Sequence, residues 1–238
     1  MKPFFTGVCA VLGSAMLIVA LLIVSIEMFA LNPGFYDSEY KKLDTAQNIG
    51  MSDDDLKSVT KNFIDYVKDA RENLDMQAEI HGQQREVFID KTEKDHMVDV
   101  KALYLGARDV RTISFIGAAV FIILAFVLGG KNAVKRLCTS FLRVSGVFVI
   151  LVAALGIYAA ADFTSFWTTF HRVFFTNDLW ILDPSKSILI QMVPEQFFSD
   201  LVTRIIIRFV SIFAALNIAA AFGSYIISKN DCKKAAGA

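Results

Sequence analysis

Histidine is the residue type in this sequence best suited to proton transfer, and two of the three histidines lie in settings that could use it. His96 lies in an acidic stretch, with Asp95 before it and Asp99 one helical turn after it. His171 lies at the edge of a run of aromatic residues. An imidazole takes up and returns a proton near neutral pH, so two such rings brought together could serve as acid and base. A carboxylate from Asp95 or Asp99 would orient one of them.

These histidines also have a simpler interpretation. A histidine on a helix is more often a surface or packing residue than a catalyst, so the residue types alone do not establish an enzyme. The third histidine, His81, lies beside Gly82 in a polar turn and is expected to be exposed and to have no role. No closely spaced pair of Cys or His residues has the spacing of a zinc site, and no metal or cofactor is expected.

Any reactive residues must be positioned by a membrane protein, because 55% of the 238 residues are apolar. A helix needs about 20 apolar residues to cross a hydrocarbon core. Four stretches are long enough: Phe4–Leu31, Ile113–Gly129, Phe141–Ala161 and Leu201–Ile227. The first exceeds the apolar core of a cleaved signal peptide and ends without a small-x-small site, which favours an uncleaved anchor.

Basic residues near the ends of these stretches predict the orientation, because cytoplasmic loops carry an excess of Lys and Arg. They gather after the second stretch and in the C-terminal tail: Lys131, Lys135, Arg136, Arg143, Lys229, Lys233 and Lys234. Both termini are therefore predicted to be cytoplasmic, with residues 32–111 and 162–200 outside. The first external segment is acidic, with 17 Asp plus Glu against 12 Lys plus Arg. Nothing in this distribution indicates a nucleic-acid partner.

The predicted fold is an all-α membrane protein, with four transmembrane helices and a small extracytoplasmic helical domain. Transmembrane helices are expected at 1–31, 112–130, 137–161 and 201–228. The other parts are an extracytoplasmic domain at 32–111, a cytoplasmic loop at 131–136, an extracytoplasmic interfacial loop with short helices at 162–200, and a cytoplasmic tail at 229–238. The cysteines, Cys9, Cys138 and Cys232, all fall on the inner side, so no external disulfide is expected.

Helical spacing predicts three helices in the external segments. Apolar residues recur on one face of 56–74, after a capping box that begins at Ser52. The same period continues through 97–110 toward the second membrane stretch. Aromatic residues lie on one face of 163–174, as expected for a helix in the headgroup region.

One distance constrains how the two histidines could meet. On a continuous helix His96 would stand 17 residues before Ile113, or about 25 Å above the membrane at a rise of ~1.5 Å per residue. His171 would lie near the headgroups. We therefore predict that the helix breaks and folds over the membrane, with Gly106 as the hinge because glycine lowers helix propensity. The two imidazoles would then line one external cavity.

Three charged residues are predicted inside the membrane near its outer side: Glu27 on the first helix, and Arg204 and Arg208 on one face of the fourth. Such charges are costly unless they pair or line a cavity. A structural ion pair between the two helices is the simpler interpretation, and a polar pocket for a substrate is the alternative. Four further residues also have two interpretations, as interfacial anchors, which is simpler, or as substrate contacts: Tyr36, Asn177, Asp178 and Trp180.

Four segments resemble, in order and spacing, the motifs of the DUF1461 integral membrane family, which includes lipoprotein intramolecular transacylases. They are residues 32–40 (NPGFYDSEY), 95–100 (DHMVDV), 170–183 (FHRVFFTNDLWILD) and 194–200 (PEQFFSD). The resemblance covers the whole predicted topology and most of the chain. It implies that the catalytic residues are His96 and His171, and that Asp99, like the polar residues above, is a candidate substrate contact.

The resemblance also implies a reaction. The substrate would be a diacylated bacterial lipoprotein with a free α-amino group on its N-terminal cysteine, reached from the extracytoplasmic face of the cell membrane. The sn-2 acyl chain would move to that amine and leave a lyso-form lipoprotein, so no serine or cysteine nucleophile is required. An α-amino group titrates near 7.7 to 8.0, so a base must take its proton. Either histidine could be this base, the other being an acid or oxyanion stabiliser.

The main alternative is a non-enzymatic membrane sensor or scaffold with an extracytoplasmic domain, in which the external histidines would lie far apart. A transporter is disfavoured because the sequence has few intramembrane charges and no repeat. A metal hydrolase is disfavoured because no closely spaced ligand pair is present. The expected partners are the lipoprotein and membrane lipids, and no oligomeric state is predicted.

Overall fold

The computed structural model describes residues 2–236, with side chains through residue 230. The chain divides into two compact units. Unit 1 contains Met1–Ser25, Asp109–Ile157 and Ile206–Ala238, and unit 2 contains Ile26–Arg108 and Tyr158–Ile205. Each unit therefore joins segments that are far apart in the sequence.

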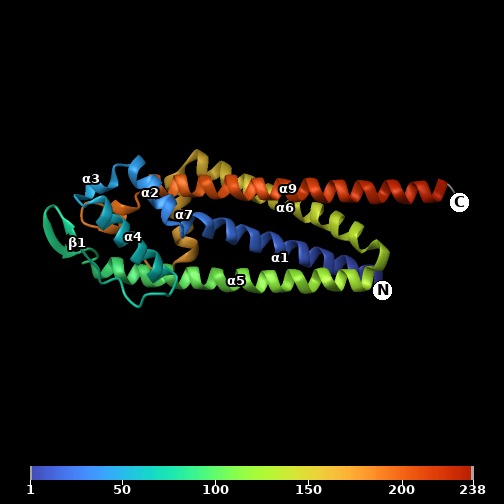
Figure 1. Cartoon of the computed structure of the whole chain (residues 1–238), viewed down its shortest axis with the longest axis horizontal. Helices are drawn as coiled ribbons and strands as arrows, with labels where there is room; N and C mark the ends of the chain where they lie inside the picture. The colour runs from blue at the N-terminus through green and yellow to red at the C-terminus, as the bar shows by residue number, and fades with distance from the viewer. Residues whose placement is uncertain (1, 237–238) are drawn as a thin grey trace. The chain divides into compact units, whose positions relative to one another are not determined.

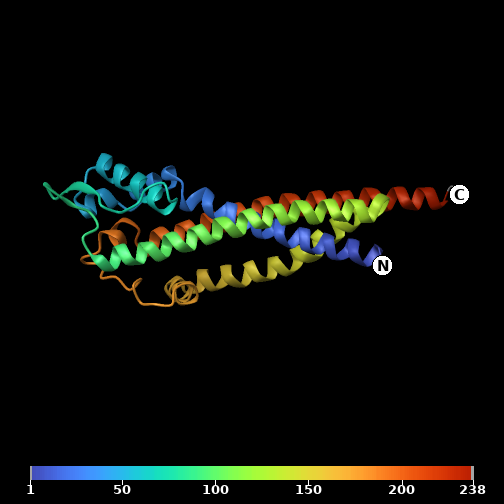
Figure 2. The ribbon, with the colours of Figure 1, turned by 90° about the horizontal axis from the view of Figure 1, so that it is seen from below.

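Unit 1 is built from long apolar helices. They are α1 (Lys2–Ala30), α5 (Lys91–Gly129), α6 (Ala133–Ala161) and α9 (Glu195–Ala236), drawn as long coils in Figures 1 and 2. A 3-10 turn, η1 (Gly130–Asn132), joins α5 to α6. Among the described residues, three helical segments are long and apolar enough to cross a membrane: Lys2–Ala30, Lys91–Ala161 and Glu195–Asn230. The middle segment contains both the second and the third stretch predicted from the sequence.

Glycines let α1 and α5 approach closely in unit 1. A Cβ atom at Gly13 would lie 3.2 Å from Ile122 Cγ1, and one at Gly117 would lie 2.1 Å from Met16 Cε. Small residues have this role where helices pack in lipid, because lipid tails are as apolar as the side chains. Many large apolar side chains of unit 1 are exposed, including Val127, Ile150, Ile157 and Ile218. An apolar outer surface of this kind is expected of helices surrounded by lipid.

The shorter helices of unit 2 are α2 (Pro33–Lys42), α3 (Thr45–Ile49), α4 (Asp53–Val67), α7 (Phe163–Phe174) and α8 (Ile188–Met192). The predicted capping box is confirmed, because Ser52 Oγ accepts from Asp55 N–H at 3.0 Å and donates to Asp55 Oδ2. Asn32 caps α2, with Pro33 as the first helical residue. The chain thus re-enters a helix directly after α1 ends.

A small β-hairpin corrects the all-α prediction. Strands β1 (Gln77–Ile80) and β2 (Gln83–Glu86) pair antiparallel, with Ile80 opposite Gln83. His81 and Gly82 form the two-residue turn, both with positive φ, as the right-handed twist of a hairpin requires. His81 is exposed, as predicted, but it also contacts the α3–α4 connection: its N–H donates to Gly50 O at 2.7 Å, and a Cβ at Gly50 would clash with its ring.

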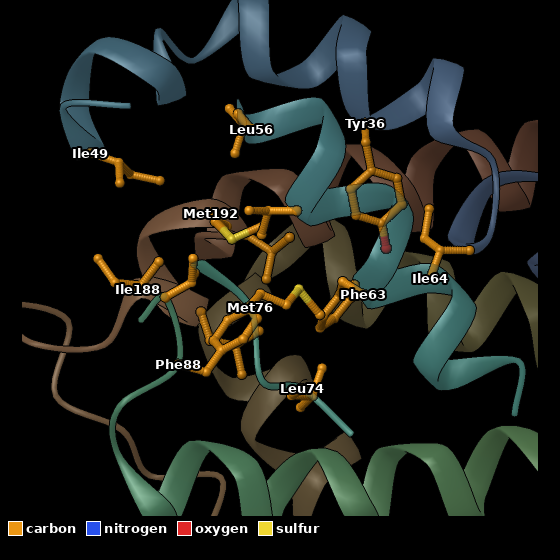
Figure 3. Close-up of a cluster of buried hydrophobic side chains, with 14 of the residues drawn as sticks. Tyr36, Ile49, Leu56, Phe63, Ile64, Leu74, Met76, Phe88, Ile188 and Met192 are labelled. Carbon is orange, nitrogen blue, oxygen red and sulfur yellow. The ribbon is translucent and has the colours of Figure 1, made fainter. Parts of the chain in front are cut away.

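One apolar core holds unit 2 together, and Figure 3 shows its centre. The side chains come from α2, α4, the hairpin region and α8: Tyr36, Leu56, Phe63, Ile64, Leu74, Met76, Phe88, Ile188 and Met192. Phe88 is fully buried, and Leu56 and Met192 are 1% exposed. Burial of each such side chain stabilises the fold by about 1.5 to 3 kcal/mol relative to exposure. This core fixes the elements that carry the site described next.

The predicted break at Gly106 is wrong, because α5 is one uninterrupted helix from Lys91 to Gly129 (Figure 1). No other residue lies within 4 Å of a Cβ built at Gly106, so a side chain would find open space there. Gly106 therefore lowers the local helix propensity, but the helix continues through it because the neighbouring turns contain strong helix formers. The hinge was expected because His96 on a straight helix would stand far above the membrane and His171 near the headgroups.

Candidate active site

The start of α5 is anchored just before His96. Asp90, just before the helix, caps it, because its Oδ1 accepts from Thr92 N–H at 2.8 Å. Glu93, buried at 2% exposure, accepts from the Ser187 hydroxyl and from Leu189 N–H. Ser187 is the N-cap of α8, so this single carboxylate joins the first turn of α5 to the first turn of α8. His96 lies one helical turn after Glu93, so the contacts of Glu93 also hold His96 in place.

Aromatic stacking positions α7 and the second histidine. Asp162 caps α7, and Trp167 stacks on Phe170 of the same helix and on Phe198 of α9, with ring centroids 5.0 and 4.3 Å apart. Thr164 Oγ1 also donates to Glu195 Oε1, at 2.6 Å. The predicted aromatic helix is thus confirmed as α7, and its first half is held against the start of α9. His171 lies in its last turn.

The two catalytic candidates meet in unit 2. The imidazole centroids of His96 and His171 are 6.1 Å apart, and the rings are 7% and 8% exposed as residues. Phe175 contacts both rings, with centroids 5.2 Å from His96 and 5.6 Å from His171. His96 on α5 and His171 on α7 therefore come together although α5 is continuous, without the predicted bend.

Hydrogen bonding distinguishes the two rings. His171 Nδ1 lies 2.8 Å from the carbonyl oxygen of Trp167, one turn earlier on α7. His96 Nδ1 is buried and has no hydrogen-bond partner among the residues that the structure describes. Burial lowers the pKa of His171, although its bond to the Trp167 carbonyl opposes this. Burial, and then the nearby His171, lowers the pKa of His96 to about 4, against a raising influence of Asp99.

A polar network continues from the histidines. Asn177 Nδ2 donates to Asp99 Oδ2 at 2.8 Å, and the Trp180 indole N–H donates to the Asn177 carbonyl at 3.0 Å. The Trp180 ring stacks on His171, with centroids 4.8 Å apart. Three of the predicted substrate contacts, Asp99, Asn177 and Trp180, are therefore joined to the histidines in one cluster.

The remaining predicted site residues lie in other settings. Tyr36 belongs to the core of unit 2 and not to an interface: it is 6% exposed, its hydroxyl donates to Ala30 O, and its ring packs on Phe197. Asp178 is exposed. Glu27 is half-buried, and Arg204 and Arg208 are exposed. The ion pair between Glu27 and either arginine stays a prediction.

Sequence reasoning assigned no role in the site to three residues of this cluster: Glu93, Trp167 and Phe175. Two of them had a signal, because Trp167 and Phe175 lie one turn before and one turn after His171 and so share its face of the helix. Glu93 lies three residues before His96, and its role depends on α8, whose position no local pattern reveals. Its carboxylate is nearly fully buried.

The histidines lie apart from two surface hollows of unit 2. These hollows, of about 360 and 440 Å³, lie against α2 and α4 and against the α2–α4 connection. Neither is lined by a histidine. Phe175 and Trp180 cover the imidazoles instead. The shared cavity stays a prediction.

Known proteins resemble the chain in sequence and fold. The family model of the lipoprotein intramolecular transacylase Lit matches residues 11–198. The structure of membrane-integral Lit from Bacillus cereus has a TM-score of 0.73 and 18% identity, over 95% of this chain and 97% of the other. Two variants of that enzyme, with one histidine replaced by arginine or alanine, give TM-scores of 0.68 and 0.69 at 18% identity, over 95% and 94% of this chain and 93% and 94% of theirs. No curated protein matches.

Proposed function

This chain belongs to the family of lipoprotein intramolecular transacylases, and from this premise we propose that His96 and His171 perform its reaction. In that reaction the sn-2 acyl chain of a diacylglyceryl-cysteine moves to the α-amino group of the same cysteine. The observation that carries the proposal is the 6.1 Å separation of two buried imidazoles from distant parts of the chain. A sensor or scaffold would have no reason to bring them together.

His171 is suited to be the base. A carbonyl oxygen can only accept a hydrogen bond, so the contact with Trp167 O requires the proton of the neutral ring to be on Nδ1. Nε2 then carries the lone pair. The lowered pKa of His171 keeps the ring neutral and ready to accept a proton near pH 7.

His96 is suited to be the hydrogen-bond donor. A buried N–H without a partner is rarer and costlier than a buried lone pair without one. Because Nδ1 of His96 has no partner among the described residues, we assign the proton of its neutral ring to Nε2. With a pKa of about 4, the ring keeps this neutral form at physiological pH. It thus offers a fixed N–H to a developing negative charge.

These two roles complete the reaction without a covalent enzyme intermediate. The substrate amine attacks the sn-2 ester carbonyl, and the C–N bond forms while His171 Nε2 takes the proton from nitrogen. The His96 N–H stabilises the resulting oxyanion. The C–O bond then breaks, and the glycerol oxygen takes the proton back from His171, so both rings return to their starting state. General base catalysis contributes about 10² to 10⁴ in rate, and one oxyanion donor about 10² to 10³.

The same premise supports a topology with four transmembrane helices, α1, α5, α6 and α9, and with both termini in the cytoplasm. The transmembrane parts would be residues 1–31, 112–130, 137–161 and 201–228. Unit 2 would then be the extracytoplasmic part. The support is that unit 2 combines the two segments that the distribution of basic residues places on one side of the membrane.

Mass spectrometry of a lipoprotein N-terminus tests the reaction. Cells that lack N-acyl lipoproteins are given the wild-type chain, His96→Ala, His171→Ala or His81→Ala. We expect the N-acyl, monoacylglyceryl form with the wild type and with His81→Ala, whose ring is an exposed turn residue, and its loss in the other two variants. Membrane levels of each variant provide the control for folding.

Full activity of His96→Ala or His171→Ala at normal membrane levels would remove that histidine from the mechanism. Wild-type protein that gives no N-acylated product would contradict the reaction itself.

A further inference from the structure

The Asp99–Asn177 hydrogen bond links the two elements that carry the histidines. Asp99 follows His96 by three residues on α5, and Asn177 follows His171 by six residues, just past the end of α7. The bond is 2.8 Å long and joins residues 78 positions apart. An ionised acceptor makes such a bond shorter and stronger than a neutral pair. It therefore sets the distance between α5 and the segment after α7.

Both oxygens of Asn177 already accept hydrogen bonds within the chain. Its Oδ1 accepts from Leu179 N–H at 3.1 Å, and its carbonyl accepts from the Trp180 indole at 3.0 Å. Trp180 in turn stacks on His171 at 4.8 Å. A continuous path therefore runs from α5 through Asp99, Asn177 and Trp180 to the His171 ring.

We propose that Asp99 and Asn177 form a clamp that holds the two imidazoles at their working separation, as positioning residues and not as substrate contacts. This inference rests on the proposed function of the histidines. Reacting groups must be held within about 0.5 Å of their productive geometry, and a displacement of about 1 Å can reduce a rate about 10²-fold. Phe175 contacts both rings, but an apolar contact does not fix the direction of either ring.

The clamp is partly exposed, so substitutions in it can be tested without unfolding the protein. Asp99 is partly buried and Asn177 is exposed. Removing an exposed hydrogen bond changes stability little, because water replaces the partner. A substitution here should therefore reduce the rate while the protein remains folded.

Exchanging the two side chains gives the sharpest experiment. Asn177→Asp alone places two carboxylates face to face and breaks the clamp, while its side chain can still accept from Leu179 N–H. Adding Asp99→Asn restores the pair with the roles exchanged. The amide at position 99 then donates, and the carboxylate at position 177 accepts. We expect a loss of about 10²-fold in kcat for Asn177→Asp, with KM unchanged, and recovery to within about tenfold of wild type in the double variant.

Asp99→Asn alone is the matched control, because an amide oxygen can still accept from Asn177 while the charge beside His96 is lost. The inference is overturned if the double variant is no more active than Asn177→Asp, or if KM rises instead of kcat falling. The assay uses the full chain in detergent with a diacylated lipopeptide, and thermal unfolding confirms that each variant is folded. Failure of the proposed function is a separate outcome, since the wild type would then form no N-acylated product.

Discussion

At the scale of single residues, the site is defined by two histidines that burial keeps neutral. An isolated imidazole titrates near 6.5, so at neutral pH an exposed pair would be partly charged and would repel. Here burial lowers the pKa of both, and the proximity of His171 further lowers that of His96. Neutral rings can sit 6.1 Å apart without repulsion, and each keeps one donor and one acceptor nitrogen.

The lowered pKa of His96 predicts a dependence of stability on pH. Its pKa is about 4 in the folded state and about 6.5 in the unfolded state. Between these values the unfolded chain binds a proton that the folded chain does not, so stability is full above pH 6.5 and is lost as pH falls toward 4. The shift corresponds to a loss of about 2 kcal/mol at pH 5 from this group.

Thermal unfolding followed by circular dichroism at pH 5 and pH 8 measures this effect. The His96→Gln variant lacks the titrating group and should lose less stability between the two pH values than the wild type. Charged groups elsewhere, including Asp99, remain in both proteins, so their contribution cancels in the comparison. Equal losses in the two proteins would contradict the low pKa.

At the scale of elements, helices with strong local signals could be predicted and contacts between distant elements could not. The capping box at Ser52 and the aromatic face of α7 are local patterns, and both are confirmed. The hairpin was overlooked because its strands, QAEI and QQRE, are polar and poor in β-branched residues. The turn at His81 and Gly82 was predicted, but the strands on either side of it were not.

The error at Gly106 had a different origin. The two histidines were correctly expected to meet, through the family resemblance, but the bend was deduced from an assumed depth of α7. The structure brings the rings together with α5 unbroken, so their meeting requires no bend. The link of Glu93 to α8 depends on residues 94 positions or more away, and no sequence period could reveal it.

That link predicts the effect of losing Glu93. Glu93→Ala leaves the Ser187 hydroxyl and Leu189 N–H buried without their acceptor, and an unsatisfied buried donor costs about 1 to 3 kcal/mol. We expect a clearly lower melting temperature. The control is Glu86→Ala, which removes a partly exposed ion pair with Lys94 worth about 0 to 1 kcal/mol. Equal melting temperatures for the two variants would show that Glu93 does not anchor α5.

At the scale of the whole molecule, the question is how a chain with three helical segments able to cross a membrane, among its described residues, could make the four proposed crossings. The segment Lys91–Ala161 has 71 residues, more than three times the roughly 20 residues that one crossing needs. It contains the turn η1, where Gly130 takes a positive φ of 51° that a residue with a side chain rarely adopts. Lys131 lies in this turn, and Lys135 and Arg136 follow it, as expected of a cytoplasmic loop.

Cysteine labelling of intact cells tests this topology. In a chain whose three cysteines are replaced by alanine, Ser185→Cys should react with an impermeant maleimide, because residues 162–200 are proposed to be outside. Lys131→Cys should react only after the membrane is permeabilised. Both wild-type residues are exposed, so access to solvent within the protein does not limit the reaction. Labelling of Lys131→Cys in intact cells would contradict the four-helix topology.

The placement of the aromatic residues around His171 has an optical consequence. The chain has two tryptophans, and both contact this ring: Trp167 and Trp180 each have centroids 4.8 Å from it. A protonated imidazole quenches indole emission on contact far more than a neutral one does. The intrinsic fluorescence of the unmodified protein therefore reports the charge state of the proposed base. A titration in a cuvette should therefore show a change in indole emission when His171 takes up a proton.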